Sequence, residues 1–329
     1  YLCLARLKVA EPPDQVRSYG GDIMSDHALT RRGFFAGALI GSAFASGVVL
    51  AQTPRDRRPR FVMDAQTHIW SGGKPSPTHR QEPFLVTDLL QQLDGARVNR
   101  AIIVTPSWNP NGNELPLEAA KTYPDRLAVM GLYDTTSKPD PAQIQNWKSR
   151  QGMLGLRLFL GSPQGKAWFT DGSSDWLWPE LQRNSVPLML FAGGMMPDVA
   201  KIVAKYPDLK ICLDSFVAPA GFVGVQAFEN YDQVLALAKF KNVSIKPVSL
   251  PFISGEAYPY RNLQPFMRRI YDAFGPERIF WGSDITLLKT PYSDCVKAFT
   301  QEMDWLSDQD LELIMGRALS KWINWPAPA

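Results

Sequence analysis

Short apolar runs alternate with amphipathic segments along the chain from Phe61 onward. Eight of the runs predict β-strands, which begin at Phe61, Arg100, Leu127, Gly155, Pro187, Lys210, Val243 and Arg278. Between them lie segments whose apolar residues recur at spacings of three and four, which predicts helices over residues 86–98, 114–125, 140–151, 174–185, 196–208, 231–241 and 263–275. The pattern therefore predicts a strand followed by a helix, repeated eight times.

Apolar strands that are separated by helices predict a parallel sheet covered by helices. Eight such units in roughly 250 residues match the size of a TIM barrel. A doubly wound open sheet is the alternative, but the segment Asp64–His68 at the first strand holds no glycine-rich phosphate loop. We predict an α/β fold, a single-domain (β/α)8 TIM barrel over residues 61–329, with a helix over residues 308–323 capping the barrel.

The first 51 residues predict a targeting segment. The run Thr30–Phe35 contains twin arginines, and a Gly- and Ala-rich apolar stretch follows it as far as Ala51. We expect a Tat-type signal that is cleaved before Gln52, a true start at Met24, and a linker over residues 52–60. An uncleaved membrane anchor is the alternative, because about 19 apolar residues can span a bilayer. The expected location is the periplasm, with the Tat translocase as partner during export and no stable membrane association after cleavage.

Composition narrows the range of partners. The 329 residues carry a formal charge of only +3, so neither nucleic acid nor an anionic membrane surface is an expected partner. The hydrophobic fraction of 45% can form a large core, and the three cysteines stand too far apart for a metal-binding pair. A small-molecule substrate is the expected partner, and the oligomeric state is left open.

Polar residues interrupt the predicted strands near their carboxyl ends, where TIM barrels hold their active sites. Asp64, Gln66 and His68 are spaced by two on the first strand, so we expect all three to point into the barrel. Asp284 ends the eighth strand. Four further polar residues lie on the fourth, sixth and seventh strands: Arg157, Asp214, Ser215 and Lys246. An ionisable group in a barrel interior is expected either in a buried pair or in a site.

Six segments of the chain resemble a known family, and they are Asp64–Trp70, Gly155–Leu158, Pro187–Phe191, Leu213–Ser215, Val243–Lys246 and Phe274–Asp284. They are similar to the amidohydrolase-related branch of the amidohydrolase superfamily, and most closely to the 2-pyrone-4,6-dicarboxylate lactonase group. The last segment is the most specific, and the resemblance extends from Phe61 to the C-terminus. It implies a (β/α)8 barrel with a hydrolytic site that uses the aspartate of the eighth strand, here Asp284.

This chain departs from the family pattern at several positions where other members bind a metal ion. Members with metal carry two histidines on the first strand, where this chain has Gln66 and His68, and a histidine ending the fifth strand, where it has Phe191. The Asp-His of the sixth strand is replaced by Asp214 and Ser215.

After residue 51 the chain holds only two histidines, His68 and His79, whereas a catalytic zinc usually needs three protein ligands. We therefore predict no catalytic metal and no other cofactor. A single divalent ion held by Asp64, Asp214 and Asp284 is the alternative.

The resemblance includes lactonases that do not depend on a metal, and it implies metal-independent hydrolysis of a lactone or related cyclic ester of an acidic small molecule. Asp284 would be the general base that takes a proton from water and returns it to the leaving oxygen. His68 would donate a hydrogen bond to the carbonyl oxygen. Lys246 and Arg157 would polarise the carbonyl or hold a substrate carboxylate.

Each assignment has a structural alternative. Lys246 and Asp214 could form a buried salt bridge between neighbouring strands, and His68 could be a core histidine satisfied by Asp64 or by a carbonyl. The expected substrate pocket includes Arg157, Gln66, Ser215, Phe191, Asp214 and Tyr133, although aromatic residues at such positions are as often core. His79 is expected to be a solvated loop residue.

Two other functions stay open. The first is a metal-dependent decarboxylase, a carbon–carbon lyase of an aromatic or unsaturated acid, because related amidohydrolases carry out that reaction. The lost histidines count against it. The second is a catalytically silent exported binding protein that keeps only a pocket, and the presence of Asp284 counts against that.

Overall fold

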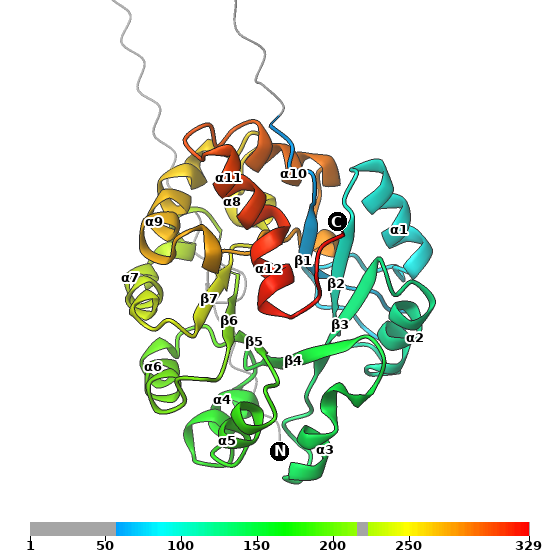
Figure 1. Ribbon diagram of the computed structural model, residues 1–329, viewed down its shortest axis with the longest axis vertical. Coiled ribbons are helices and arrows are strands. Elements are labelled where there is room, and N and C mark those ends of the chain that lie inside the picture. The colour runs from blue at the N-terminus through cyan, green and yellow to red at the C-terminus, as the bar shows by residue number, and fades with distance from the viewer. Residues whose placement is uncertain (1–56, 216–222, 329) are drawn as a thin grey trace, which may run out of the picture. The chain divides into compact units, whose positions relative to one another are not determined.

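The computed structural model describes residues 57–215 and 223–328. Seven parallel strands form one curled sheet, in which each strand pairs with the next along the chain (Figure 1). Their bounds are β1 Met63–Thr67, β2 Arg100–Val104, β3 Leu127–Leu132, β4 Met153–Phe159, β5 Leu188–Phe191, β6 Ile211–Asp214 and β7 Val243–Lys246. The prediction of an α/β fold with a parallel sheet is confirmed.

Most of the helices surround the sheet on its outer face, but the last of them, Ala318–Trp322, packs against the inner apolar layer (Figure 1). They are α1 Val86–Gly95, α2 Glu114–Thr122, α3 Pro141–Gln145, α4 Pro163–Thr170, α5 Leu177–Arg183, α6 Met196–Lys205, α7 Tyr231–Leu235, α8 Leu250–Ser254, α9 Gln264–Phe274, α10 Tyr292–Thr300, α11 Asp308–Glu312 and α12 Ala318–Trp322. All seven predicted helical segments contain a helix. The helices α4, α8 and α10 were not predicted.

The predicted eighth strand is not a regular strand, and the described sheet therefore has seven strands rather than eight. The segment 279–284 nevertheless takes its place between β7 and β1. The Ile245 carbonyl of β7 accepts a backbone hydrogen bond from this segment at 2.9 Å, and the backbones of Ala65 and Gln66 bond to it at 3.0 and 2.9 Å. Gly282 explains the close approach, because a Cβ there would lie 3.0 Å from the Gln66 nitrogen.

Two apolar layers hold the sheet. Strand residues such as Ile103 and Leu213 face outward and pack against the helices in the larger cluster. The inner layer includes Met63 and Phe280, together with Leu319 of α12. The predicted C-terminal cap therefore packs on the inner layer, although it is divided into α11, a π-helical turn and α12.

The strand β1 contains a bulge. Asp64 pairs with Ala101 and Thr67 with Ile103, so three steps along β1 match two steps along β2. Such a bulge places one extra residue on a strand and shifts the alternation of its side chains. Gln66 lines the interior cavity, whereas Asp64 does not. The prediction that Asp64 points into the barrel with Gln66 and His68 is wrong for this reason.

The predicted signal at residues 1–51, its cleavage before Gln52 and the start at Met24 lie outside the described residues, and they stay predictions. The predicted linker is described from Arg57, whose guanidinium donates to the Met303 carbonyl oxygen at 2.8 Å. Within residues 57–215 and 223–328, none of the helices has both the length and the apolar character needed to cross a membrane.

Candidate active site

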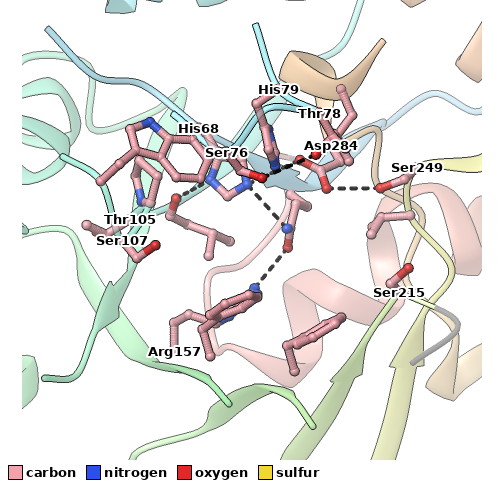
Figure 2. A pocket seen from close by; sticks show the side chains of 18 of the residues that line it. His68, Ser76, Thr78, His79, Thr105, Ser107, Arg157, Ser215, Ser249 and Asp284 are labelled. Carbon is pink, nitrogen blue, oxygen red and sulfur yellow. Dashed lines mark hydrogen bonds and ion pairs between the residues drawn. The ribbon is translucent and has the colours of Figure 1, made fainter. Parts of the chain in front are cut away.

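A cavity of about 440 Å³ lies where the carboxyl ends of the strands meet (Figure 2). Its walls combine hydroxyl groups with aromatic rings, from Ser76, Thr78, Thr105, Ser107, Trp108, Phe159, Phe191, Ser215, Ser249 and Phe252. The titratable groups in its lining are His68, Lys74, His79, Arg157 and Asp284. The cavity is therefore a mixed polar and aromatic site, of a size that suits a small organic molecule.

His68 and Asp284 form a buried pair at this cavity. The Nε2 atom of His68 lies 3.2 Å from Oδ1 of Asp284, and each residue is only 6% exposed. On the other side of the ring, His68 Nδ1 lies 2.6 Å from the carbonyl oxygen of Val104. Because a carbonyl only accepts, Nδ1 carries a hydrogen, and any proton on Nε2 faces Asp284.

The second oxygen of Asp284 accepts a hydrogen bond from the Ser249 hydroxyl at 2.9 Å (Figure 2). Burial by itself would raise the pKa of Asp284. The hydrogen bond and charge of His68, the charge of His79 and the Ser249 hydroxyl together hold that pKa below its usual value of 3.8. Asp284 is therefore an ionised carboxylate at neutral pH.

Three cavity residues share an unusual backbone conformation. Ser215, Ser249 and Asp284 have φ angles of 59°, 63° and 55°, in the left-handed region that residues other than glycine rarely adopt. Ser215 directly follows β6, Ser249 lies in the loop after β7, and Asp284 ends the segment 279–284. The turns bring all three side chains to the same cavity.

His79 lies in the cavity wall rather than in a solvated loop, which corrects the prediction. Its Nδ1 atom lies 2.9 Å from the Thr286 hydroxyl, and its ring centroid is 4.7 Å from that of Trp108 and 5.6 Å from that of His68. Burial lowers the pKa of His79 to about 4, which keeps the ring neutral at pH 7. Its position in the wall depends on long-range contacts that no local pattern revealed.

Beneath the cavity, the Asp214 carboxylate pairs with two positively charged side chains. It forms an ion pair with Arg157, and its other oxygen lies 2.8 Å from Lys246 Nζ. The alternative of a buried salt bridge between β6 and β7 is thus the arrangement found. Lys246 is 0% exposed and does not line the cavity, and burial lowers its pKa although Asp214 opposes that change.

Gln66 joins the buried cations to the histidine. Its Oε1 atom accepts a hydrogen bond from Lys246 Nζ and lies 3.4 Å from Arg157 Nη1. Its Nε2 atom lies 3.4 Å from His68 Nε2. Polar side chains therefore run without a gap from Asp214 to Asp284.

Of the other predicted pocket residues, Ser215 and Phe191 line the cavity. Phe191 stacks on Phe159 with centroids 5.0 Å apart. The prediction that Tyr133 lines the substrate pocket is wrong, because Tyr133 lies outside the cavity lining. Its ring centroid is 6.2 Å from that of Trp168, in an aromatic cluster. Asp214 likewise lies behind the lining.

Asp64 lies between β1 and the segment that carries Asp284. Its Oδ1 atom accepts from the backbone nitrogens of Gln66 and Ser283 at 2.9 and 3.0 Å. Its Oδ2 atom accepts from the hydroxyls of Ser283 and Tyr292 at 2.6 and 2.8 Å. Burial raises the pKa of Asp64 to about 6 although these four bonds oppose the change. Asp64 therefore positions the backbone beside the site.

Ser249 and Trp108 also line this cavity, although no sequence pattern assigned them to it. Both follow strands in loops, where a serine or tryptophan carries no pattern that separates a site from ordinary structure.

The residues at the cavity do not fit a zinc centre. Catalytic zinc sites usually use three protein ligands, and the cavity offers His68 and Asp284, because the oxygen of Gln66 is turned toward two cations. His79 does not add a third metal ligand to His68 and Asp284. Within residues 57–215 and 223–328, no group of three or more His, Cys, Asp or Glu side chains could hold a metal ion.

Comparisons with known proteins place the chain. An L-fucono-1,5-lactonase from Burkholderia ambifaria is 24% identical over 233 residues, which cover 68% of this chain and 80% of that relative. An amidohydrolase from Burkholderia multivorans, solved with bound zinc, has a TM-score of 0.68 at 19% identity and covers 81% of this chain and 100% of its own. A probable 2-pyrone-4,6-dicarboxylic acid hydrolase from Acinetobacter baumannii, solved with citric acid bound, has a TM-score of 0.61 at 18% identity, over 80% of this chain and 99% of its own.

The two solved structures show that the fold is shared. The family model described as amidohydrolase matches residues 63–318, which is most of the chain. The resemblance predicted from the sequence is confirmed at the level of the family: the chain belongs to the amidohydrolase family.

Proposed function

We propose that the protein hydrolyses a lactone or related cyclic ester of a small acidic molecule without a metal, with Asp284 as the general base. The observation that carries the proposal is the ionised Asp284 carboxylate, which lies 3.2 Å from His68 Nε2 at the wall of the cavity. The lactonase relative supports the substrate class. The donor set, which lacks a third metal ligand, supports metal independence.

The chemistry begins with a water molecule between Asp284 and the lactone. Asp284 takes one proton from the water while the water oxygen bonds to the carbonyl carbon of the lactone. The carbonyl oxygen becomes an oxyanion. The ring C–O bond then breaks as the oxyanion collapses. Asp284 returns its proton to the alkoxide that leaves, and the product is an open-chain hydroxy acid.

His68 provides the electrostatic help in this scheme. With Nδ1 bound to the Val104 carbonyl, the ring is held so that an Nε2–H would face Asp284, and an oxyanion formed beside Asp284 would share that proton in a bifurcated hydrogen bond. A pre-oriented donor in a buried site stabilises developing charge better than water does. Asp284 stays ionised beside His68, because His68, His79 and the Ser249 hydroxyl together hold its pKa below the usual value, so it is in the form that can accept a proton.

A carboxylate on the substrate would meet Arg157, because Arg157 lines the cavity and Lys246 does not. Asp214 already neutralises part of the charge of Arg157, so the grip on a carboxylate is weaker than that of a free guanidinium. The assay must therefore include lactones with and without a carboxylate.

Export through the twin-arginine pathway to the periplasm is the second part of the proposal. It is supported by Arg31 and Arg32 and by the apolar stretch that ends at Ala51. N-terminal sequencing of protein recovered from the periplasm should begin at Gln52. Recovery of only uncleaved protein from the cytoplasm would contradict it.

The test of the activity is turnover on a panel of neutral and carboxylated lactones, before and after chelation, with metal content measured by mass spectrometry. We expect chelator-resistant hydrolysis that falls by about 10²–10⁴-fold in Asp284→Asn. The exposed Asp272→Asn on α9 is the matched control and should leave the rate unchanged.

Three results would contradict the proposal. Activity that requires one bound metal per chain would refute metal independence. Release of carbon dioxide from an aromatic acid would indicate the decarboxylase. Ligand binding with no turnover across the panel would indicate the silent binding protein.

A further inference from the structure

The two ends of the Gln66 amide have different surroundings. Lys246 Nζ and Arg157 Nη1 face the oxygen end, and both groups can only donate hydrogen bonds. An amide nitrogen in that position would meet two donors and no acceptor. The oxygen of Gln66 must therefore face the cations, which leaves the NH2 group at the cavity end, 3.4 Å from His68 Nε2.

The cations themselves are fixed. Asp214 pairs with both of them, and Arg157, Lys246 and Asp214 are 6%, 0% and 1% exposed. Two cations and one carboxylate leave one positive charge beside the oxygen of Gln66. A buried charge of this kind strongly favours an acceptor next to it, so the amide is held in one orientation.

Gln66 Nε2 and His68 Nε2 are placed to reach one common oxygen. Two nitrogens 3.4 Å apart can both lie about 2.9 Å from the same acceptor, which is an ordinary hydrogen-bond distance. Both residues line the cavity, and Asp284 adjoins them. A carbonyl oxygen that becomes an oxyanion can accept both bonds at once.

We propose that Gln66 is a catalytic residue, and that its NH2 group and His68 Nε2–H together form the oxyanion hole. Lys246 and Arg157 are positioning residues that act through Gln66 by fixing the orientation of its amide. The inference rests on the proposed lactone hydrolysis. It gives the buried charge network, which lies behind the cavity wall, a role in the reaction.

The variant Gln66→Glu separates this role from a structural one. A carboxylate of almost the same size still accepts hydrogen bonds from Lys246 and Arg157, but it has no N–H to donate. A structural role predicts a folded and active variant. A donor role predicts that kcat falls by about 10²–10³-fold while KM changes little, because the lost bond forms in the transition state.

The experiment measures kcat, KM and thermal unfolding for the wild type, Gln66→Glu, the exposed control Gln233→Glu on α7, and Asp284→Asn. A folded Gln66→Glu with the expected loss in kcat supports the inference. A Gln66→Glu variant within threefold of the wild type overturns it, while an inactive Asp284→Asn leaves the lactonase proposal standing. A wild type that hydrolyses no lactone overturns both.

A measurement on the unaltered protein covers the case in which Gln66→Glu does not fold. A cyclic phosphonate analogue of the best lactone carries a charged oxygen where the oxyanion would form. In ¹⁵N-labelled wild type, we expect its binding to shift one side-chain NH2 proton of Gln66 downfield as that proton enters a charge-assisted hydrogen bond. A Gln66 NH2 signal that does not move at saturating analogue would overturn the inference.

Discussion

Asp64 offers a quantitative test of the electrostatics behind the site, through the variant Asp64→Asn. Its Oδ1 atom accepts two backbone bonds, from Gln66 and Ser283, which an asparagine oxygen also accepts. Its Oδ2 atom accepts from the hydroxyls of Ser283 and Tyr292, which can rotate to accept from an asparagine NH2 group instead. Asparagine therefore copies the neutral form of Asp64.

The magnitude follows from the pKa. Burial raises the pKa of Asp64 from 3.8 to about 6, and each pKa unit corresponds to about 1.4 kcal/mol. The folded protein holds this proton more tightly than the unfolded chain does. The resulting stability is complete below pH 3.8 and is lost as the pH rises through 6, and its total is about 3 kcal/mol. Roughly 2 kcal/mol of that loss falls between pH 4.5 and 7.5.

The assay is urea unfolding of the wild type and Asp64→Asn across pH 4.5 to 7.5. His79 also titrates in this range, but it is present in both proteins, so it cancels in the difference. We expect the wild type to lose about 2 kcal/mol relative to Asp64→Asn as the pH rises. A constant offset is allowed, because the new amide changes the hydrogen bonds at every pH. A difference that stays flat with pH would refute the reasoning.

Two further predictions concern the other buried groups. Burial lowers the pKa of His79 to about 4, so its stability contribution is present above pH 6.5 and is lost as the pH falls toward 4. In His79→Gln, urea unfolding should show that the wild type loses about 3 kcal/mol relative to the variant between pH 7 and 4, and a loss in the opposite direction would contradict this. Asp214→Asn leaves two buried cations without a carboxylate and should cost about 3–5 kcal/mol, whereas Lys246→Met keeps the Arg157–Asp214 pair and should cost less than half as much. Equal losses in denaturant unfolding would show that the two cations do not share one counterion.

The repeated pattern of the chain was sufficient for the fold class, because apolar runs and amphipathic segments reflect burial on two faces of one sheet. It was not sufficient for the eighth strand, where Gly282 and the left-handed Asp284 interrupt regular pairing. It also missed the bulge in β1. A bulge is a mismatch between two strands, and it cannot be read from the alternation within one of them.

The site was predictable where chemistry and strand position coincide. Asp284 and His68 stand at strand ends, and the structure brings them together at the cavity. The burial of His79 depends on a contact with Thr286, 207 residues away along the chain. Tyr133 shows the opposite failure, since a ring near a strand end packs into an aromatic cluster instead of the cavity. Long-range packing decides both cases.

The left-handed residues at the cavity have a consequence for laboratory evolution of this protein. Ser215, Ser249 and Asp284 hold a backbone conformation that glycine adopts without strain and that asparagine tolerates well. A library randomised at these three positions should therefore divide according to the screen. Selection for heat resistance would enrich glycine and asparagine at all three, whereas selection for turnover would retain aspartate at position 284. At these strand ends, the residues that favour thermal stability therefore differ from those that favour catalysis.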